Sequence, residues 1–393
     1  MSIRERLSGN EAVAIALRQI NPDVFPAFPI TPSTEIPQYF SSYVANCQVD
    51  TVFVPVESEH SSMSATIAAE AAGARSLTAT SSCGLAYMWE PLYVAASDRL
   101  PLALALVCRA LSGPININCD HSDVMGARDA GWIQIFAENN QEAYDNFVQA
   151  YRIAEHPSVR LPIMVCQDGF ITSHGVENIE LIEDEKVKAF VGEYNPEHYM
   201  LKKDEPMALG PYGVPAYYME AKRAQLEALY NAKQVALDVA KEFATISGRE
   251  YGLFEEYKTE DADFVMVIIG SAAGTAKDAV DALREKGVKA GVLKIRLFRP
   301  FPAEEIAAAI KNAKVVACMD RTESYNGNCG PLGAEVKAAL YGAENAPKVL
   351  NYVYGLGGRD VTVDSLTSVF ADMQTVEETG ELGAAYRYLS IRE

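Results

Sequence analysis

The sequence predicts an α/β protein built from two consecutive units, each with a parallel sheet covered by helices. Short runs such as LALALV at 102–107 and DFVMVIIG at 263–270 have the continuous apolar character of strands buried on both faces. Segments with helical spacing separate these runs, and strands that alternate with helices form parallel sheets. A chain of 393 residues is also too long for one ordinary core.

The bulk composition is that of a globular protein outside the membrane. It is 49 % hydrophobic and 22 % charged, and the net charge of −19 argues against nucleic-acid binding, which needs a basic face. The seven cysteines form no CxxC pair, so we predict neither an iron–sulfur cluster nor a structural zinc site. The N-terminus reads as neither a signal peptide nor a membrane anchor, and we expect a cytoplasmic protein.

The first unit is predicted to span residues 1–258. Its helices are expected to begin near 8–10 and 34–37 and to cover 59–74 and 140–156. Its strands are expected at 51–56, 76–80, 102–107, 132–137 and 161–166.

Within the first unit, the character of the sequence changes over 173–255. The first part lacks a strong period and contains several prolines, which predicts an excursion over the surface, and a long helix is expected at about 216–246. Excursions of this length usually serve an interface or a function. Two interpretations stay open: the segment packs against another subunit, or it wraps the core of this chain.

The second unit, 259–393, is predicted to be Rossmann-like. Its strands are expected at 263–270, 289–298, 314–320 and 348–356, with helices at 275–287 and 302–313. The turn GSAAGTA at 270–276 departs from GxGxxG, and no acidic residue follows where a ribose would need one. We interpret it as a packing turn at a helix start.

Candidate site residues follow the strands of the first unit, where open parallel sheets bind ligands. We expect the segments 28–35, 57–60, 81–84 and 109–123 to meet in one cleft. In the first of these, Pro29 and Pro32 restrict Ile30 and Thr31, because proline fixes its own φ and limits the residue before it. Thr31 is therefore a candidate partner for a ligand oxygen, and the alternative is that Thr31 or Thr34 only caps the next helix.

Two charged residues are the other candidates. Glu59 begins the alanine-rich helix, where it either complements the helix dipole or points at a ring nitrogen in the cleft. Arg109 ends the most apolar strand, and its guanidinium suits a carboxylate, which is either a substrate or Asp120 or Asp123. His121 and Asp123 suggest a metal, but the spacing supplies no third ligand, so loop-stabilising contacts are favoured.

Several catalytic motifs are absent, among them Walker A, GxSxG and HExxH. Thiamine enzymes hold diphosphate and Mg²⁺ with a GDG motif, and QDGF at 167–170 lacks its first glycine. If this chain handles thiamine diphosphate, it holds only one end of it.

The sequence resembles the alpha subunits of multi-subunit pyruvate:ferredoxin oxidoreductases over nearly its whole length. The matching blocks are FPITPSTEIP at 28–37, SEHSSMSATIAAEAAGAR at 58–75, the segments 109–145 and 162–174, LKIRLFRPFP at 293–302 and YGLGGRD at 354–360. The main departure is Phe28 in place of the usual tyrosine, which bears on substrate fit.

The resemblance implies a thiamine-diphosphate-binding domain of the pyrimidine type, followed by a transketolase C-terminal-type domain. It assigns Glu59 to N1′ of the aminopyrimidine, with Pro29 and Ile30 beside the cofactor, and Thr31 and Arg109 to the 2-oxoacid. The implied reaction is the oxidative decarboxylation of pyruvate with coenzyme A to acetyl-CoA and CO₂, a reaction of anaerobic metabolism.

The resemblance also implies a hetero-oligomer. A beta subunit is expected to hold the diphosphate and Mg²⁺, and [4Fe-4S] clusters on the beta and ferredoxin-like delta subunits to pass electrons to ferredoxin, with a gamma subunit completing the complex. The alternatives are a related enzyme for 2-oxoisovalerate, 2-oxoglutarate or oxalate, a subunit of a non-redox thiamine enzyme, and a non-catalytic scaffold.

Overall fold

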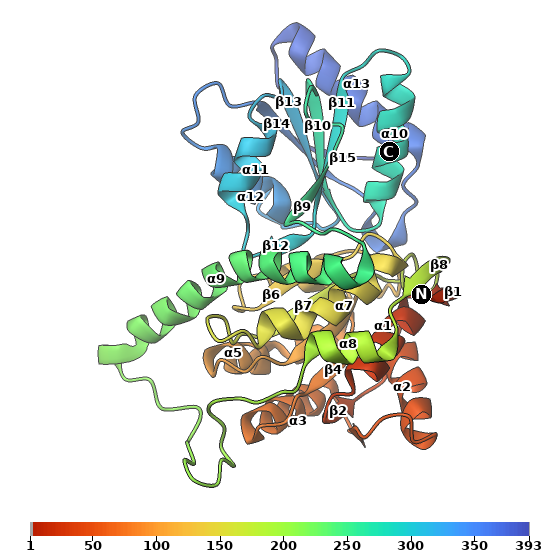
Figure 1. Cartoon of the computed structure of the whole chain (residues 1–393). Helices are drawn as coiled ribbons and strands as arrows, with labels where there is room; N and C mark the ends of the chain where they lie inside the picture. The colour runs from red at the N-terminus through yellow and green to blue at the C-terminus, as the bar shows by residue number, and fades with distance from the viewer. Residues whose placement is uncertain (1–2, 393) are drawn as a thin grey trace.

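Two α/β domains stack on one another, and one long helix runs along their junction (Figure 1). The structure is a computed structural model that describes residues 3–392. No helix among these residues is long and apolar enough to cross a membrane. All seven cysteines are unpaired, and Cys47 and Cys83 are the two that are exposed.

The first domain is built on a five-stranded sheet in the order β12–β6–β7–β5–β4. Its bounds are β4 (Leu77–Thr80), β5 (Ala103–Cys108), β6 (Ile133–Phe136), β7 (Ile163–Asp168) and β12 (Leu297–Arg299). The strands β4 to β7 are parallel, as predicted. Beyond β4, the parallel pair β2 (Val24–Ala27) and β3 (Val52–Pro55) continues the layer through a bridge between Val24 and Ser76.

Helices cover both faces of this sheet. They are α1 (Gly9–Ile20), α2 (Glu35–Ala45), α3 (Glu59–Ala72), α4 (Ser82–Tyr87), α5 (Trp89–Ser97), α6 (Ser122–Gly126) and α7 (Asn140–Ala154). All six residues of β5 are buried, and they alternate between two hydrophobic clusters on opposite faces. The continuous apolar runs in the sequence therefore mark strands buried on both sides, as we expected.

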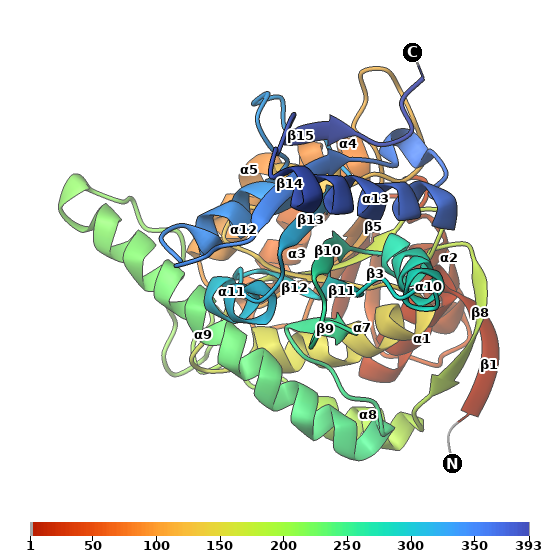
Figure 2. The same cartoon turned by 90° about the horizontal axis from the view of Figure 1, so that it is seen from above.

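The segment 173–255 is more regular than its sequence suggests. It contains β8 (Val176–Leu181), which pairs with β1 (Ile3–Ser8), and then α8 (Asp184–Val191). The expectation of an irregular stretch from 173 is therefore wrong in its first part, because β8 and α8 bury too few residues to show a strong period. The long helix is α9 (Pro215–Ser247). Its second half packs on α7, and its first half projects from the body (Figure 2).

The second domain has a six-stranded sheet in the order β15–β14–β13–β10–β11–β9. The strands are β9 (Phe254–Tyr257), β10 (Phe264–Ile269), β11 (Ala290–Ile295), β13 (Val315–Asp320), β14 (Lys348–Val353) and β15 (Tyr386–Tyr388). The helices are α10 (Ala272–Arg284), α11 (Ala303–Ile310), α12 (Pro331–Leu340) and α13 (Val363–Thr379), with a 3₁₀ turn at Leu356–Gly358.

The two sheets share the segment that we predicted as one strand, 289–298. It divides at Arg296 into β11, in the second sheet, and β12, which pairs antiparallel with β6 of the first sheet. Arg296 is buried and donates to Asn146 and Gln149 of α7. The second domain therefore contributes a strand to the first, and this joins the two bodies through backbone hydrogen bonds.

Candidate active site

The structure brings Arg109 and Thr31 together at the carboxyl edge of the first sheet. Arg109 follows β5 directly and is 7 % exposed. Its Nη1 donates to the backbone carbonyl of Thr31 at 2.9 Å, and its Nε donates to the carbonyl of Asn116 at 3.0 Å. These two contacts fix the plane of the guanidinium, because its donors have a rigid fork geometry.

The charge of Arg109 is not neutralised by its neighbours. Asp123 accepts from the backbone N–H of Arg109, and Asp120 accepts from Ser122 and Gly357, so neither aspartate pairs with the guanidinium. Among residues 3–392 no carboxylate forms a salt bridge with it. A buried cation without an anion is costly, so this geometry favours a ligand that carries a carboxylate.

The loop before α2 presents Thr31 to the same edge. Thr34 occupies the N-cap position of α2 but makes no side-chain capping bond, and Ser33 closes the loop by donating to the carbonyl of Ile30 at 2.8 Å. The side chain of Thr31 is exposed. The capping alternative is therefore not realised by Thr34, and the hydroxyl of Thr31 is accessible to a ligand.

Glu59 lies at the start of α3, against the turn after β4. Ser58 caps the helix by accepting from the N–H of Ser61, so Glu59 also has the position that complements the helix dipole. A Cβ added at Gly84 would lie 2.9 Å from Oε1 of Glu59 and would also meet the hydroxyl of Thr80. Only glycine at position 84 lets the carboxylate and the turn come this close.

Two hydroxyls at the end of β4 lack hydrogen-bond partners among the described residues. Thr80 ends β4 and Ser81 follows it, and both are fully buried. Among the described residues, no group forms a hydrogen bond with Thr80 Oγ1 or Ser81 Oγ. Buried polar atoms are nearly always satisfied, so these orphaned hydroxyls, next to a cradle that only glycine permits, fit a polar ring that enters beside Glu59.

Cys83 stands in the same turn and is exposed. Its Sγ lies 3.0 Å from the hydroxyl of Ser112. Burial alone would raise the pKa of the Cys83 thiol, but the hydrogen bonds from Ser112 and the charge of Arg109 outweigh burial, so that the pKa is lowered. The turn after β4 and the loop after β5 are thus in contact at several points.

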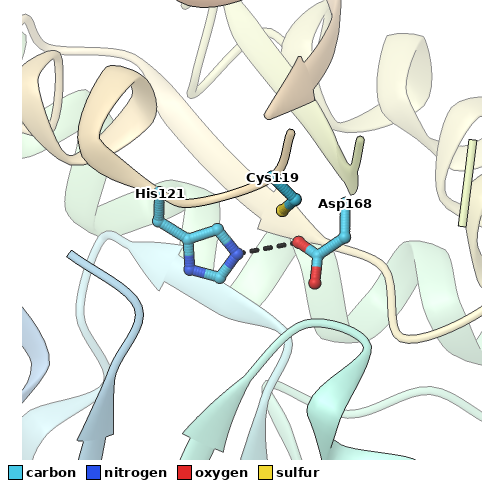
Figure 3. Close-up of side chains that lie close together, drawn as sticks. All are labelled: Cys119, His121 and Asp168. Atoms are coloured by element: carbon cyan, nitrogen blue, oxygen red, sulfur yellow. Dashed lines mark hydrogen bonds and ion pairs between the residues drawn. The ribbon is translucent and has the colours of Figure 1, made fainter. Parts of the chain in front are cut away.

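Asp168, the last residue of β7, interacts with His121 of its own domain (Figure 3) and with two residues of the second domain. Oδ1 of Asp168 lies 2.7 Å from Nε2 of His121, and Oδ2 accepts from Arg321 at 3.0 Å and from the hydroxyl of Ser271 at 2.6 Å. Burial alone would raise the pKa of Asp168, but His121 and Arg321 lower it overall. Ser271 belongs to the turn at 270–276, which therefore acts in packing, as we interpreted it.

This joint is not a metal centre. Cys119, His121 and Asp168 bring three potential ligand atoms close together, which supplies the third ligand that sequence spacing lacked. However, the Arg321 guanidinium already neutralises Asp168, and burial raises the pKa of Cys119 well above its ordinary value. A cation there would face a fixed positive charge and a protonated thiol, which are unfavourable to a bound metal.

The second domain also supports the loop that holds Arg109. The side chain of Asn116 donates to the carbonyl of Gly357 at 3.0 Å, and the N–H of Gly358 donates to the backbone carbonyl of Cys119 at 2.8 Å. A Cβ at Gly357 would lie 2.5 Å from the Asn116 amide, so the glycines in this motif permit the close approach. A cleft of about 620 Å³ opens beside this contact, and residues of both domains line it, among them Ser112 and Glu323.

Comparison with protein families matches both domains. Residues 15–241 match the family described as pyruvate flavodoxin/ferredoxin oxidoreductase, thiamine diphosphate-binding, and residues 262–366 match pyruvate:ferredoxin oxidoreductase core domain II. The chain belongs to the pyruvate:ferredoxin oxidoreductase family. The resemblance that we drew from the sequence is therefore confirmed.

Curated relatives of this oxidoreductase family extend over the whole chain. Pyruvate synthase subunit PorA of Thermotoga maritima is 52 % identical over 99 % of this chain and 98 % of its own length, and the PorA of Methanocaldococcus jannaschii is 44 % identical over 96 % of each. Ketoisovalerate oxidoreductase subunit VorA of Pyrococcus horikoshii is 42 % identical over 97 % of this chain and 96 % of its own length.

Solved structures show the same fold at lower identity. A 2-oxoglutarate:ferredoxin oxidoreductase from Magnetococcus marinus superposes with a TM-score of 0.73 at 21 % identity, over 95 % of this chain and 65 % of that one. A split-gene transketolase superposes with a TM-score of 0.55 at 10 % identity, over 95 % of this chain and 100 % of that one. The predicted α/β architecture of the thiamine-enzyme type is thus confirmed.

Sequence reasoning missed several residues of this region. Thr80 carries no pattern that separates it from ordinary strand-end residues, and Ser81 was included only as part of the segment 81–84. Arg321 had a usable signal, because it directly follows the apolar strand at 314–320, as Arg109 follows its own strand. Applying the same rule to both strands would have identified Arg321.

Proposed function

We propose that this chain binds the aminopyrimidine end of thiamine diphosphate through Glu59 and the carboxylate of a 2-oxoacid through Arg109. The enzyme is a pyruvate:ferredoxin oxidoreductase and the chain is its alpha subunit, in line with PorA relatives at 44–52 % identity over nearly the full length. The observation that carries the proposed site is the buried guanidinium of Arg109, which is oriented by two carbonyls and has no carboxylate partner among the described residues.

The residues around Glu59 fit an aminopyrimidine. The Glu59 carboxylate accepts a hydrogen bond from N1′ of the ring, which favours the tautomer whose exocyclic nitrogen takes a proton. Gly84 lets the turn after β4 pack closely against the Glu59 side chain, and the hydroxyls of Thr80 and Ser81 in the same region have no partner among the described residues. Thiamine diphosphate, when bound, supplies the carbon nucleophile and the electron sink for decarboxylation.

Arg109 and Thr31 hold the substrate. The guanidinium of Arg109 has five N–H donors. Two of its N–H groups bind carbonyls, and the remaining donors are available for a carboxylate. Thr31, Pro29 and Ile30 form the stiff wall of the loop beside it. In the overall reaction pyruvate and coenzyme A give acetyl-CoA and CO₂, and the two electrons released go to ferredoxin.

The complex contains further subunits. PorA is itself named as a subunit, and QDGF at 167–170 lacks the glycine expected of a diphosphate motif, so we assign the diphosphate and Mg²⁺ to a beta subunit. We assign the [4Fe-4S] clusters, which pass electrons to ferredoxin, to beta and delta subunits, with a gamma subunit alongside. The ring of Tyr87 lies 5.8 Å from that of His60, the residue after Glu59, and Tyr87 is 58 % and Trp89 is 44 % exposed, which suits a face covered by another protein.

The test of this assignment is Glu59→Gln in the assembled complex, with Glu57→Gln as the matched control. Glu57 is exposed two residues away and accepts from the hydroxyl of Ser61. We expect Glu59→Gln to abolish turnover and Glu57→Gln to leave it unchanged. Turnover near that of the wild type in Glu59→Gln would refute the role of Glu59.

The choice of 2-oxoacid is tested on the same complex. Comparing kcat/KM for pyruvate with that for 2-oxoisovalerate gives the preference directly, because VorA relatives match at 42 % identity. We expect pyruvate to be preferred. A preference for the branched oxoacid would move the chain to the VorA group while leaving the site assignment intact.

A further inference from the structure

Asp123 lies between the two halves of the proposed site and touches both. It is in the second position of α6 and is 3 % exposed. Its Oδ2 accepts from the backbone N–H of Ser82 at 2.8 Å and from the backbone N–H of Arg109 at 3.0 Å. One oxygen atom thus binds the turn after β4 and the end of β5 at the same time.

The turn that Asp123 holds has an unusual backbone. Ser82 has a φ of +48°, a left-handed conformation that is uncommon for residues other than glycine. Such a conformation persists only where the surroundings hold it. The bond from Asp123 supplies one support, and the Ser82 hydroxyl, which donates to the carbonyl of Ala110, supplies a second. Two residues further on, Gly84 lies against Glu59.

The hydrogen bond from the N–H of Arg109 to Asp123 lies on the substrate side of the proposed site. The N–H of Arg109 is at the point where β5 ends, and the guanidinium of the same residue is oriented by Thr31 and Asn116. Fixing the backbone at Arg109 therefore fixes the origin of the side chain that would hold the carboxylate. The spacing between Glu59 and Arg109 is set through Ser82, Asp123 and the end of β5.

We propose that Asp123 is a positioning residue that fixes the distance between the cofactor side and the substrate side of this site. The proposal rests on the proposed function and extends it to a residue that contacts neither ligand. Both carboxylate oxygens act as acceptors, because Oδ1 also accepts from the N–H of Val124 at 2.7 Å. Burial raises the pKa of Asp123 to about 7, and the three backbone N–H donors oppose that rise by favouring the ionised form. An asparagine has one acceptor and two donors, so it leaves at least one of three backbone N–H groups facing another donor.

The test is Asp123→Asn in the assembled complex, with Glu70→Gln as the matched control. Glu70 is also buried and accepts from the N–H and hydroxyl of Ser76, but it lies near the opposite end of α3 from Glu59. Two quantities are measured: the affinity of the cofactor-free complex for thiamine diphosphate by calorimetry, and the KM for pyruvate. Thermal unfolding of each complex reports stability.

For Asp123→Asn we expect the affinity for the cofactor to fall by about tenfold or more and the KM for pyruvate to rise by about tenfold or more, because charge-assisted hydrogen bonds are lost. Glu70→Gln should change stability alone. If both variants alter only stability, or if one of the two measured quantities alone changes in Asp123→Asn, the proposal is overturned. These results stay separable from the Glu59 assignment, because Glu59→Gln tests that assignment on its own.

The proposal can still be tested if the Asp123→Asn complex fails to assemble. If Asp123→Asn does not assemble, Asp123→Glu keeps the charge and both oxygens but moves them by one methylene. An assembled Asp123→Glu complex with weakened cofactor affinity and a raised KM supports positioning. Failure of both variants to assemble, while Glu70→Gln assembles, assigns Asp123 to folding and refutes the proposal.

Discussion

Arg109 donates to the backbone carbonyl of Thr31 at 2.9 Å across a sequence separation of 78 residues. This bond joins the ends of β2 and β5, which the parallel sheet brings to the same edge. It uses the guanidinium as a clamp on the loop while leaving other donors for a ligand. The rigid loop at 28–35 and the buried cation are thus parts of one arrangement, and disturbing either should be felt by the substrate.

Replacing Arg109 by alanine should weaken substrate binding with little effect on assembly. The carboxylate loses its charged partner and the loop at Thr31 loses its clamp, so we expect the pyruvate KM to rise by about ten- to a hundredfold. Arg99→Ala is the matched control, because Arg99 also donates to two carbonyls, those of Val159 and Arg160. Steady-state kinetics of the complex provide the measurement, and an unchanged KM in Arg109→Ala would contradict the assignment.

Gly84→Ala should interfere with the cofactor and leave the fold intact. The added methyl group would lie 2.4 Å from the Thr80 hydroxyl and 2.9 Å from Oε1 of Glu59, closer than real Cβ atoms approach, so both side chains must move. We expect the affinity for thiamine diphosphate to fall by about tenfold or more. Gly126→Ala is the control, since a Cβ there meets nothing within 4 Å. Calorimetry on the cofactor-free complex gives the affinity, and equal values for both variants would argue against a ring beside Glu59.

Asp168→Asn should loosen the joint between the domains. Removing this carboxylate leaves Arg321 buried without its anion. Breaking a buried ion pair in this way lowers stability by about 3–5 kcal/mol. Asp184→Asn, which breaks a half-exposed pair with Arg18, should cost about 0–1 kcal/mol. Hydrogen exchange at the start of α10 in the complex measures the free energy of local opening.

The pH dependence of this joint follows from the lowered pKa of Asp168. A carboxyl group whose pKa is depressed by folding stabilises the fold above its unfolded pKa, near 4, and loses that contribution as the pH falls through the lower folded value. The difference between wild type and Asp168→Asn should therefore be constant from neutral pH down to about pH 5 and shrink in stronger acid. A difference that disappears already near neutral pH would contradict this account.

The parts of the fold that could be predicted from the sequence are those whose signal lies within one short segment. The strand β5 and the helix α3 follow directly from a continuous apolar run and from alanine-rich helical spacing. The strand β12 does not, because periodicity cannot say which sheet receives a strand, and the buried Arg296 that divides the run finds its partners about 150 residues away.

The same limit applies to the site. Arg109 could be named because it ends a predicted strand, Glu59 because it begins a predicted helix, and Thr31 because two prolines stiffen its loop, although their roles stay predictions. Asp123 was singled out for a possible metal, whereas its contact with Ser82 spans 41 residues and depends on two turns meeting in space. Its role is a property of the assembled sheet edge.

Cys83 should report on this edge chemically. Burial opposes ionisation of the thiol, but the hydrogen bonds from Ser112 and the charge of Arg109 lower its pKa overall, so more of it is thiolate at neutral pH than in an ordinary cysteine. We expect iodoacetamide to alkylate Cys83 in the isolated chain faster than Cys47, the other exposed thiol, and the ratio to fall in Arg109→Ala. Assembly with the other subunits should protect Cys83 more than Cys47, because we propose that another subunit covers the face beside Glu59. Peptide mass spectrometry over time follows both sites, and equal protection of the two thiols would place the subunit interface elsewhere.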